Sequence, residues 1–222
     1  MMGSARLERH RASAARAKPR MAAALSAGAR VKLSAYLDLL AKWNRVYNLT
    51  AIRDRARMQS HHVADALAVL PYLPDTPGTR LLDVGSGGGI PGIPLAIARP
   101  DWQVVLLDAN GKKVTFLTQA AIELGLVNAR AVTSRIEDYS PDAPFDVVIA
   151  RAFSDLRTFA EAATKHVAAD GIIVAMKGAF PQDEIDALPD NVEVTATPSL
   201  DVPQLHAERH LVVMRAARGT PT

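Results

Sequence analysis

The chain has 222 residues, of which 49% are hydrophobic and 22% are charged, a composition typical of one sizeable globular domain with a smaller appendage. It contains no cysteine, which excludes a disulfide framework, a thiolate metal site and a cysteine nucleophile. Because the usual route to C5-methylated pyrimidines needs a cysteine nucleophile, that route is excluded as well. No apolar run approaches the ~20 residues that span a bilayer, so we expect a soluble, cytoplasmic protein with no membrane partner.

Positive charge is concentrated at the N-terminus. Residues 1–20 carry six basic residues against one acidic residue, Glu8, whereas the rest of the chain holds 20 basic and 22 acidic residues. The segment is rich in Ala, Ser and Arg and poor in large apolar residues, so we expect a disordered basic tail. It could attract a phosphate backbone, act as an organelle transit peptide, or precede a true initiator at Met21, and the sequence leaves these readings open.

Residues 21–75 are expected to form a helical cap. Apolar residues at i, i+3, i+4, i+7 spacing predict an amphipathic helix of about four turns, which starts at residue 31 and is interrupted at residues 48–50. A second helix is predicted over residues 54–70, before the turn-rich segment 71–78. The helical spacing favours Trp43 and Tyr47 as core residues, although either ring could stack on a base.

Strands and helices alternate in the remaining domain, residues 76–216, which a short tail follows at 217–222. Strands are predicted at 81–84, 104–107, 130–132, 145–150 and 172–176, and helices at 90–98, 112–124 and 155–167. This alternation predicts a doubly wound, mostly parallel sheet. The last two apolar runs, 192–196 and 210–214, have no long helix between them and predict a terminal antiparallel hairpin.

A glycine-rich turn follows the first of these strands. Glycines at positions 85, 87, 88 and 89 allow positive φ and leave no Cβ between the backbone and a ligand, and the helix that follows offers unpaired N–H groups. Asp108 ends the next strand, 23 residues after Gly85, close to the offset of roughly 20 residues at which a carboxylate reaches ribose hydroxyls. The pattern predicts a nucleotide-like cofactor.

Two cofactors fit these glycines. Residues 87–92 also match the dinucleotide pattern G-x-G-x-x-G, so an NAD-dependent enzyme is an alternative. A dinucleotide fold has two mononucleotide halves, whereas this chain shows one half, two more strands and a closing hairpin, the architecture of S-adenosylmethionine-dependent methyltransferases. We therefore expect an α/β, Rossmann-like class I methyltransferase with a seven-stranded sheet and S-adenosyl-L-methionine as its cofactor.

Eight groups of residues, in unbroken order between Tyr36 and Val213, also match one family. They are KWNRVYNLT at 42–50, His62 with Asp65, DVGSGGGIPGIP at 83–94, LD at 107–108 with KK at 112–113, SRIE at 134–137, IARAF at 149–153, KG at 177–178 and ERHLV at 208–212. In them the chain resembles the glucose-inhibited division protein B family, bacterial methyltransferases that modify a guanine at N7 in 16S ribosomal RNA, in the region of the 530 loop. Ala66 and Gly88 depart from a serine and a proline that are common in the family, and the first departure removes a hydroxyl.

The resemblance implies which residues contact the cofactor: Gly85, Ile90, Ile136, Glu137 and Arg151, to which the glycine pattern adds Gly87 and Asp108. Glu137 and Arg151 follow the third and fourth strands, so both are expected in the crevice at the carboxyl edge of the sheet. Glu137 is expected to accept from the adenine amino group, Ile90 to lie against the ring and Asp108 to bind the ribose. Arg151 is expected to bind the cofactor carboxylate or an RNA phosphate, the alternative being a guanidinium that is paired with a neighbouring carboxylate or solvated at the end of the strand.

The implied chemistry needs no catalytic proton acceptor. N7 of guanine presents a free lone pair, so it can attack the methyl group directly and in line. Amine methylation usually employs Asp or Asn followed by Pro-Pro after the fourth strand, where this chain has Arg151-Ala152-Phe153. His61 and Asp65 share a helix face at i, i+4, but we interpret them as surface or packing residues. His61 and His62 are adjacent and point apart on a helix, so no metal site is predicted.

Substrate contacts are expected from basic and polar residues beside the crevice, namely Arg45, Asn48, Arg53, Lys177, Arg209 and His210. The expected partner is 16S ribosomal RNA, within the small ribosomal subunit or an assembly intermediate. A non-enzymatic ribosome-assembly factor on the same scaffold is an alternative, because the choice of substrate rests on the resemblance.

Overall fold

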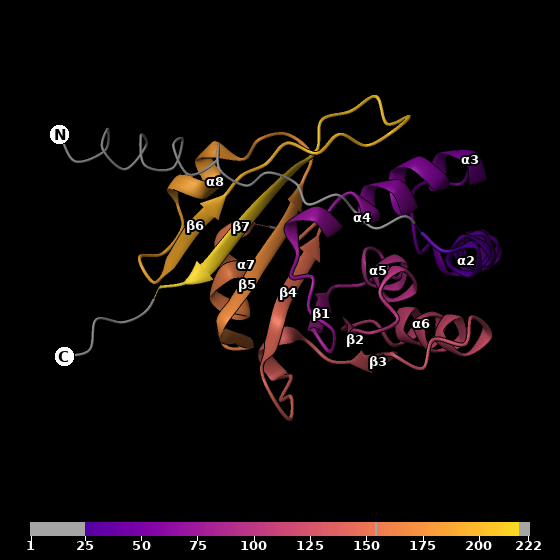
Figure 1. Cartoon of the computed structure of the whole chain (residues 1–222), viewed down its shortest axis with the longest axis horizontal. Coiled ribbons are helices and arrows are strands. Elements are labelled where there is room, and N and C mark those ends of the chain that lie inside the picture. The colour runs from indigo at the N-terminus through magenta and orange to yellow at the C-terminus, as the bar shows by residue number, and fades with distance from the viewer. Residues whose placement is uncertain (1–24, 154, 218–222) are drawn as a thin grey trace.

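The computed structural model describes residues 25–153 and 155–217 (Figure 1). The expected tail at 1–20 lies outside the described residues, as does the end of the chain from residue 218. Of the helices in the described ranges, none is both long enough and apolar enough to cross a membrane.

A single seven-stranded sheet forms the centre of the molecule, with strand order β3-β2-β1-β4-β5-β7-β6. The strands are β1 (Arg80–Val84), β2 (Gln103–Asp108), β3 (Ala129–Thr133), β4 (Phe145–Arg151), β5 (Val167–Lys177), β6 (Val192–Ala196) and β7 (His210–Ala216). The first five are parallel, and β7 runs antiparallel to both β5 and β6. The predicted parallel sheet and its terminal hairpin are confirmed, and β7 inserts between β5 and β6.

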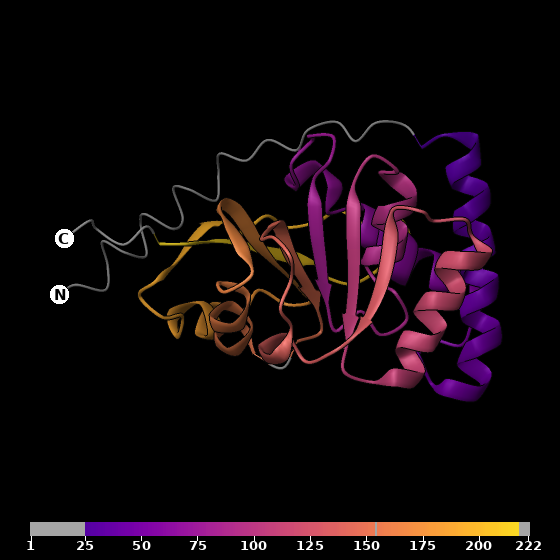
Figure 2. The same cartoon turned by 90° about the horizontal axis from the view of Figure 1, so that it is seen from below.

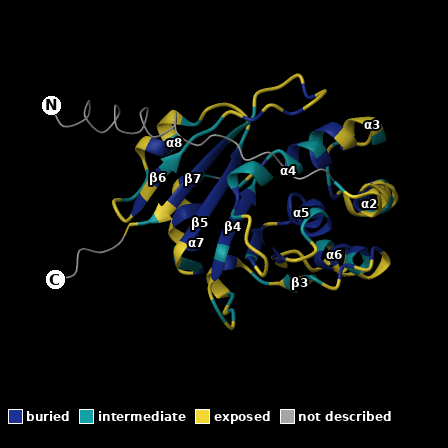
Figure 3. Ribbon diagram, viewed as in Figure 1, coloured by how far each residue is buried: buried dark blue, intermediate teal, exposed yellow. Residues whose placement is uncertain are grey.

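Alternating side chains along the strands build one core on each face of the sheet. Leu81 and Leu106 join the cluster beneath α2 (Ala27–Tyr47), α5 (Gly92–Ala98) and α6 (Gly111–Glu123). Leu82 and Leu107, their neighbours in sequence, join the cluster beneath α7 (Leu156–Ala163) and α8 (Gln182–Asp186). Strands buried on both faces explain the unbroken apolar runs of the sequence. Figure 2 shows α2 and α6 side by side at the edge of the sheet, and Figure 3 shows the buried strands at the centre.

The first predicted helix is confirmed as α2, which starts earlier than expected because Ser26 caps it by accepting from Ala29 N at 3.0 Å. Trp43 is half-buried, and its ring lies 5.7 Å from that of Phe116 on α6. The prediction that Tyr47 is a core residue is wrong: its ring stacks on that of Trp43, with the centroids 5.3 Å apart, but its side chain is 40% exposed.

The second predicted helix is not a continuous α-helix. It consists of α3 (Arg55–Met58), a π-helical segment (Gln59–Ala64), α4 (Asp65–Leu67) and a 3₁₀ turn (Leu70–Tyr72). Its start is as predicted, since Asp54 caps α3 by accepting from Arg57 N at 2.7 Å. A π-helical segment widens the turn and is often found at functional sites. Here His62 lies within the π-helical segment, Asp65 follows it directly at the start of α4, and both side chains are buried.

Two predicted helix bounds are wrong. The helix expected from residue 90 starts at Gly92, and the helix expected over 155–167 ends at Ala163. Val167 instead opens β5 and pairs with Phe145, with an irregular register before Ile172. Gly171 allows this close approach of the two chains, because a Cβ there would lie 2.9 Å from the Asp146 carbonyl oxygen.

Candidate functional site

The carboxyl ends of the first four strands form one edge. Val84 at the end of β1 pairs with Leu107 on β2 and with Ala150 on β4, and Asp108 pairs with Thr133 on β3. The chain order of the strands reverses at β1, so the crevice beside its carboxyl end is the position where open α/β sheets bind ligands. The predicted cofactor residues after β1, β2, β3 and β4 therefore lie along one edge.

The glycines of the turn after β1 divide into two kinds. Gly85 and Gly87 have φ of +70° and +57°, and a Cβ on Gly85 would meet nothing within 4 Å. A Cβ on Gly89 would overlap Ile93, and one on Gly92 would overlap Leu106. Gly85 and Gly87 thus expose backbone to open space where a ligand can approach closely, whereas Gly89 and Gly92 serve packing.

Asp108 holds this turn in place. Its carboxylate accepts from Gly87 N and from Asn110 N, each at 2.9 Å, and Lys113 Nζ lies 3.8 Å away. Each carboxylate oxygen has a second lone pair, so the side chain keeps acceptor capacity toward the open space. A buried carboxylate beside an exposed glycine, Gly85, and a half-buried one, Gly87, fits the ribose and the adjoining part of a nucleoside cofactor.

The other predicted cofactor residues differ in exposure. Ile90 is buried beside the turn, and Ile136 is buried in the 3₁₀ turn Ile136–Asp138, where its carbonyl accepts from His166 Nε2 at 2.9 Å. Glu137, in the same turn, is exposed. Its side chain is therefore accessible at the carboxyl edge of the sheet, where it could contact an adenine amino group.

Two buried groups at the turn were not among the predicted site residues. Asp83 accepts from Gly92 N at 2.9 Å through Oδ2, while its Oδ1 has no hydrogen-bond partner among the residues that the structure describes, and burial raises its pKa to about 7. Tyr36 of α2 donates to the Gly88 carbonyl at 2.6 Å, and burial raises its pKa. This bond fastens the cap to the glycine turn. The helical spacing marks Tyr36 as a core residue but gives no sign of a partner 52 residues away.

Arg151 lies among buried polar side chains of the cap. Its Nη1 is 3.4 Å from Asp65 Oδ2, and Arg209 Nε donates to Asp65 Oδ1 at 3.0 Å. Asp65 is 1% exposed, so one buried carboxylate is shared by two arginines. The alternative role expected for Arg151, pairing with a neighbouring carboxylate, is therefore observed. The pairing leaves 23% of the Arg151 side chain exposed, so this residue can still contact a ligand. The loop before β7 that carries Arg209 extends toward α3 and α4 in Figure 1.

His62 completes this network. Its Nδ1 lies 3.4 Å from Arg151 Nη1 and its Nε2 lies 2.9 Å from Thr50 Oγ1. Burial and the positive charge of Arg151 lower the pKa of His62 to about 4, so the ring is uncharged at neutral pH. No hydrogen bond joins His61 to Asp65 in the part of the chain that the structure describes, and His61 Nδ1 lies 3.0 Å from the Arg57 carbonyl oxygen. Within residues 25–153 and 155–217, no cluster of His, Asp and Glu could hold a metal ion.

The residues predicted to contact RNA form two groups. Lys177, Arg209 and His210 lie where β5 ends and β7 begins, and Lys177 Nζ is 2.6 Å from Glu184 Oε2. His210 Nδ1 lies 3.0 Å from the Gly178 carbonyl oxygen. Arg45 and Asn48 lie on the cap, at the end of α2, where Asn48 adopts φ of +49°. The charges of Lys177 and Arg209 are thus already paired within the protein, whereas the cap group is exposed.

Opposite pH dependence is expected from His62 and Asp83. The unfolded chain binds a proton on His62 near its ordinary pKa of 6.5, so the free energy of unfolding falls as the pH drops from about 6.5 to 4. The folded chain binds a proton on Asp83 up to about pH 7, so that group makes the free energy of unfolding fall as the pH rises from 3.8 to about 7.

Relative to the unsubstituted chain, Asp83→Asn should therefore lose stability on acidification and His62→Gln should gain it. Each difference is expected to approach about 1.4 kcal/mol per pH unit at most, since one proton is involved. Urea unfolding at pH 4.5, 5.5 and 6.5 measures it. Identical pH profiles for both variants and the unsubstituted chain would contradict these assignments.

Comparison with known proteins gives one consistent family. The model of the GidB family, described as rRNA small subunit methyltransferase G, matches residues 29–212. A protein of Laribacter hongkongensis named Ribosomal RNA small subunit methyltransferase G is 55% identical over 190 residues, which are 85% of this chain and 90% of that protein. A protein of the same name from Chromobacterium violaceum is 55% identical over 182 residues, 82% of this chain and 86% of that protein.

Solved structures show the same fold at low identity. Precorrin-6y C5,15-methyltransferase from Geobacter metallireducens aligns with a TM-score of 0.53 and 16% identity, over 68% of this chain and 87% of that chain. The seven-stranded sheet with its inserted antiparallel strand and the helices on both faces is the predicted Rossmann-like class I methyltransferase fold.

Proposed function

We propose a reaction for this chain from one premise: the chain belongs to the GidB family, described as rRNA small subunit methyltransferase G. The reaction is transfer of a methyl group from S-adenosyl-L-methionine to N7 of a guanine in 16S ribosomal RNA, in the region of the 530 loop. The observation that carries it is the open space before Gly85 and Gly87, beside the buried carboxylate of Asp108.

The residues at the carboxyl edge have distinct tasks in this proposal. Gly85 and Gly87 let the cofactor approach the backbone, and Asp108 accepts from the ribose hydroxyls. Glu137 accepts from the adenine amino group, and Ile90 lies against the ring. Arg151 binds the cofactor carboxylate or an RNA phosphate through its exposed portion. S-adenosylmethionine, when bound, supplies the activated methyl group.

No residue is needed as a general base. N7 of guanine carries a free lone pair and loses no proton when it accepts the methyl group. His62, which is uncharged and buried, and Asp65, which is paired with two arginines, therefore position other groups. The contribution of the protein is to hold N7, the methyl carbon and the sulfur in line.

The substrate is proposed to be 16S ribosomal RNA in the small subunit or in an assembly intermediate, in the cytoplasm. In paired A-form RNA, N7 faces a deep and narrow groove that side chains cannot enter. The target guanine is thus expected to be unpaired or flipped out of its stack.

Incubation with methyl-labelled S-adenosylmethionine tests the activity. Unmodified small subunits, protein-free 16S ribosomal RNA and transfer RNA are offered in parallel, and label is expected in the small subunits or in their RNA and not in transfer RNA. Equal labelling of transfer RNA would contradict the substrate class. Binding of S-adenosylmethionine without label in any RNA would favour the assembly factor.

The NAD-dependent alternative is tested separately by calorimetry. The full-length chain is titrated with S-adenosylmethionine and with NAD under identical conditions. We expect binding of the first and none of the second, since an antiparallel pair, β7 and β6, closes the sheet where a second mononucleotide half would continue it in parallel. Tighter binding of NAD would overturn the choice of cofactor.

A further inference from the structure

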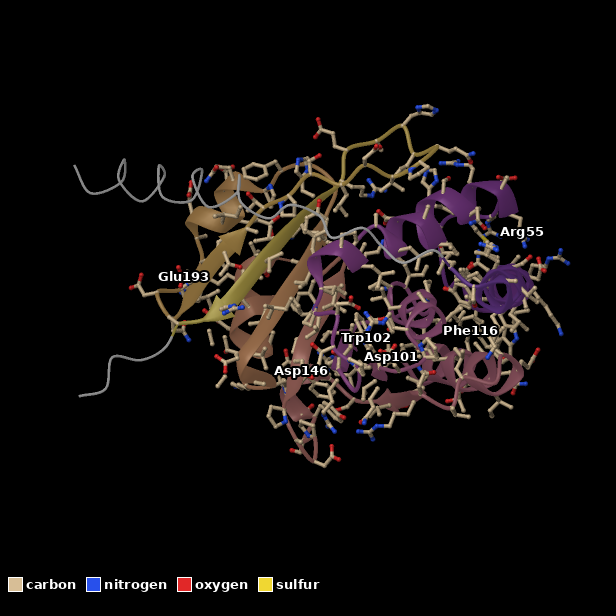
Figure 4. All side chains as sticks on the ribbon, viewed as in Figure 1. Arg55, Asp101, Trp102, Phe116, Asp146 and Glu193 are labelled. Carbon is tan, nitrogen blue, oxygen red and sulfur yellow. The ribbon has the colours of Figure 1, made fainter. Side chains whose placement is uncertain are left out.

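A basic groove lies on the outer side of the cap. Its volume is about 540 Å³, and it is formed by the second half of α2 together with Arg53 and Arg55. Four basic side chains line it, Lys42, Arg45, Arg53 and Arg55. Figure 4 shows Arg55 at the side of α2.

The positive charge of the groove is largely uncompensated. Asp38 is the one acidic residue of its lining, and its carboxylate forms an ion pair with Arg55 Nε at 2.6 Å. Lys42 and Arg45 form no ion pair with any described residue, and Arg53 donates only to the neutral amide oxygen of Asn48, at 3.5 Å. Three cations therefore face one concave surface in a chain that is net acidic beyond residue 20.

A buried asparagine holds the shape of the groove. Asn44 accepts from Thr50 N at 2.9 Å and donates to the Ile52 carbonyl at 3.3 Å, and it is 3% exposed. These bonds fix the loop that carries Arg53 relative to α2. The groove is thus preformed, because the conformational entropy of the loop is lost when the chain folds and not when a ligand binds.

The same loop separates the groove from the candidate cofactor site. Its inner side reaches the glycine turn, since a Cβ on Gly88 would lie 3.6 Å from the Leu49 carbonyl oxygen. Thr50 Oγ1 lies 2.9 Å from His62 Nε2, which in turn approaches Arg151. An extended chain lying in the groove would therefore continue into the crevice across a single loop.

We infer that this groove binds the sugar–phosphate backbone of the substrate RNA at nucleotides flanking the target guanine. The inference rests on the proposed function and adds a second contact region, separate from the crevice. Arg45 and Arg53 offer planar forks of N–H donors that match phosphate oxygens, and Lys42 offers a point charge. Phosphate contacts of this kind position the strand without reading its sequence.

Binding of labelled, protein-free 16S ribosomal RNA to the full-length chain over a range of salt concentrations tests the inference. Arg45→Gln and Lys42→Gln are each expected to weaken binding roughly tenfold and to lower the slope of log affinity against log salt by about 0.7 to 0.9. In methyl transfer, KM should rise and kcat should stay unchanged, because the groove contacts no reacting atom. The calorimetric Kd for S-adenosylmethionine should also be unchanged.

Two matched controls remove the same charge elsewhere. Arg215→Gln on β7 and Lys165→Gln before β5 alter exposed residues far from the cap and should leave affinity within about twofold. If Arg45→Gln and Lys42→Gln behave like these controls, the inference is wrong. A loss of affinity for intact small subunits but not for protein-free RNA would also overturn it, in favour of a ribosomal protein as the partner.

The two proposals fail in different ways. If no RNA is methylated but the groove variants lower RNA affinity and the salt slope, RNA binding by the groove is supported and the proposed reaction is wrong. If RNA is methylated and the groove variants match the controls, the proposed reaction is supported and RNA binding by the groove is wrong.

Discussion

Replacing Asp65 with alanine is expected to lower the free energy of unfolding by about 3 to 5 kcal/mol, the cost of leaving buried charges without their partner. The carboxylate is 1% exposed and lies 3.0 Å from Arg209 Nε and 3.4 Å from Arg151 Nη1. Its removal leaves two largely buried guanidinium groups facing each other without a counter-charge. Urea unfolding followed by circular dichroism at pH 7 measures the effect.

Asp38→Ala is the control for this prediction. It also removes a carboxylate from an arginine in the cap, but the Asp38–Arg55 pair has side chains that are 63% and 41% exposed. Exposed pairs contribute at most about 1 kcal/mol, so this variant should unfold nearly as the unsubstituted chain does. Equal losses for the two variants would contradict a special role for Asp65. Asp65→Asn retains an acceptor and should lie between them.

Replacing Asp108 with alanine is expected to weaken S-adenosylmethionine binding about a hundredfold, the loss expected for two hydrogen bonds to a charged acceptor. The variant loses the proposed acceptor for the ribose, and Gly87 N and Asn110 N lose the oxygens that fix the turn. Calorimetry at a temperature where the variant is folded gives the Kd. Asp108→Asn, which keeps the size of the side chain, guards against a folding defect and should lose about tenfold.

Asp101→Ala provides a matched control at the opposite end of the same strand. Asp101 precedes the first residue of β2, Gln103, whereas Asp108 is the last residue of that strand, and Asp101 pairs with Arg99 at 2.8 Å. Its removal should leave the Kd for the cofactor unchanged. A Kd for Asp108→Ala within about twofold of the unsubstituted chain would remove Asp108 from the cofactor site.

Most of the fold could be predicted from local sequence patterns, above all from unbroken apolar runs. Strands buried on both faces require unbroken apolar runs, which is why β1, β2, β4 and β5 could be found from sequence. Prediction failed where tertiary contacts override local pattern. Val167 continues the apolar pattern of the helix predicted before it but pairs with Phe145 on β4, and Tyr47 keeps the helical period of α2 although its side chain is 40% exposed.

The site was predictable to the extent that it is local in sequence. The glycine turn and Asp108 lie within one βαβ unit, so their spacing alone indicated a cofactor. The network around Arg151 had no such signal, because Asp65 and Arg209 are separated by 144 residues and meet only in the folded chain. Hydrophobic periodicity also gives no sign of the π-helical segment, which contains His62 and ends directly before Asp65.

Strand cleavage specific for N7-methylated guanine locates the methyl group that the proposed reaction adds. Small subunits without the modification are incubated with the chain and S-adenosylmethionine, and their 16S ribosomal RNA is then cleaved and mapped. We expect one new cleavage at a guanine in the 530-loop region, absent when cofactor is withheld. A methyl group found on any other atom or base, or no methyl group with cofactor bound, would contradict it.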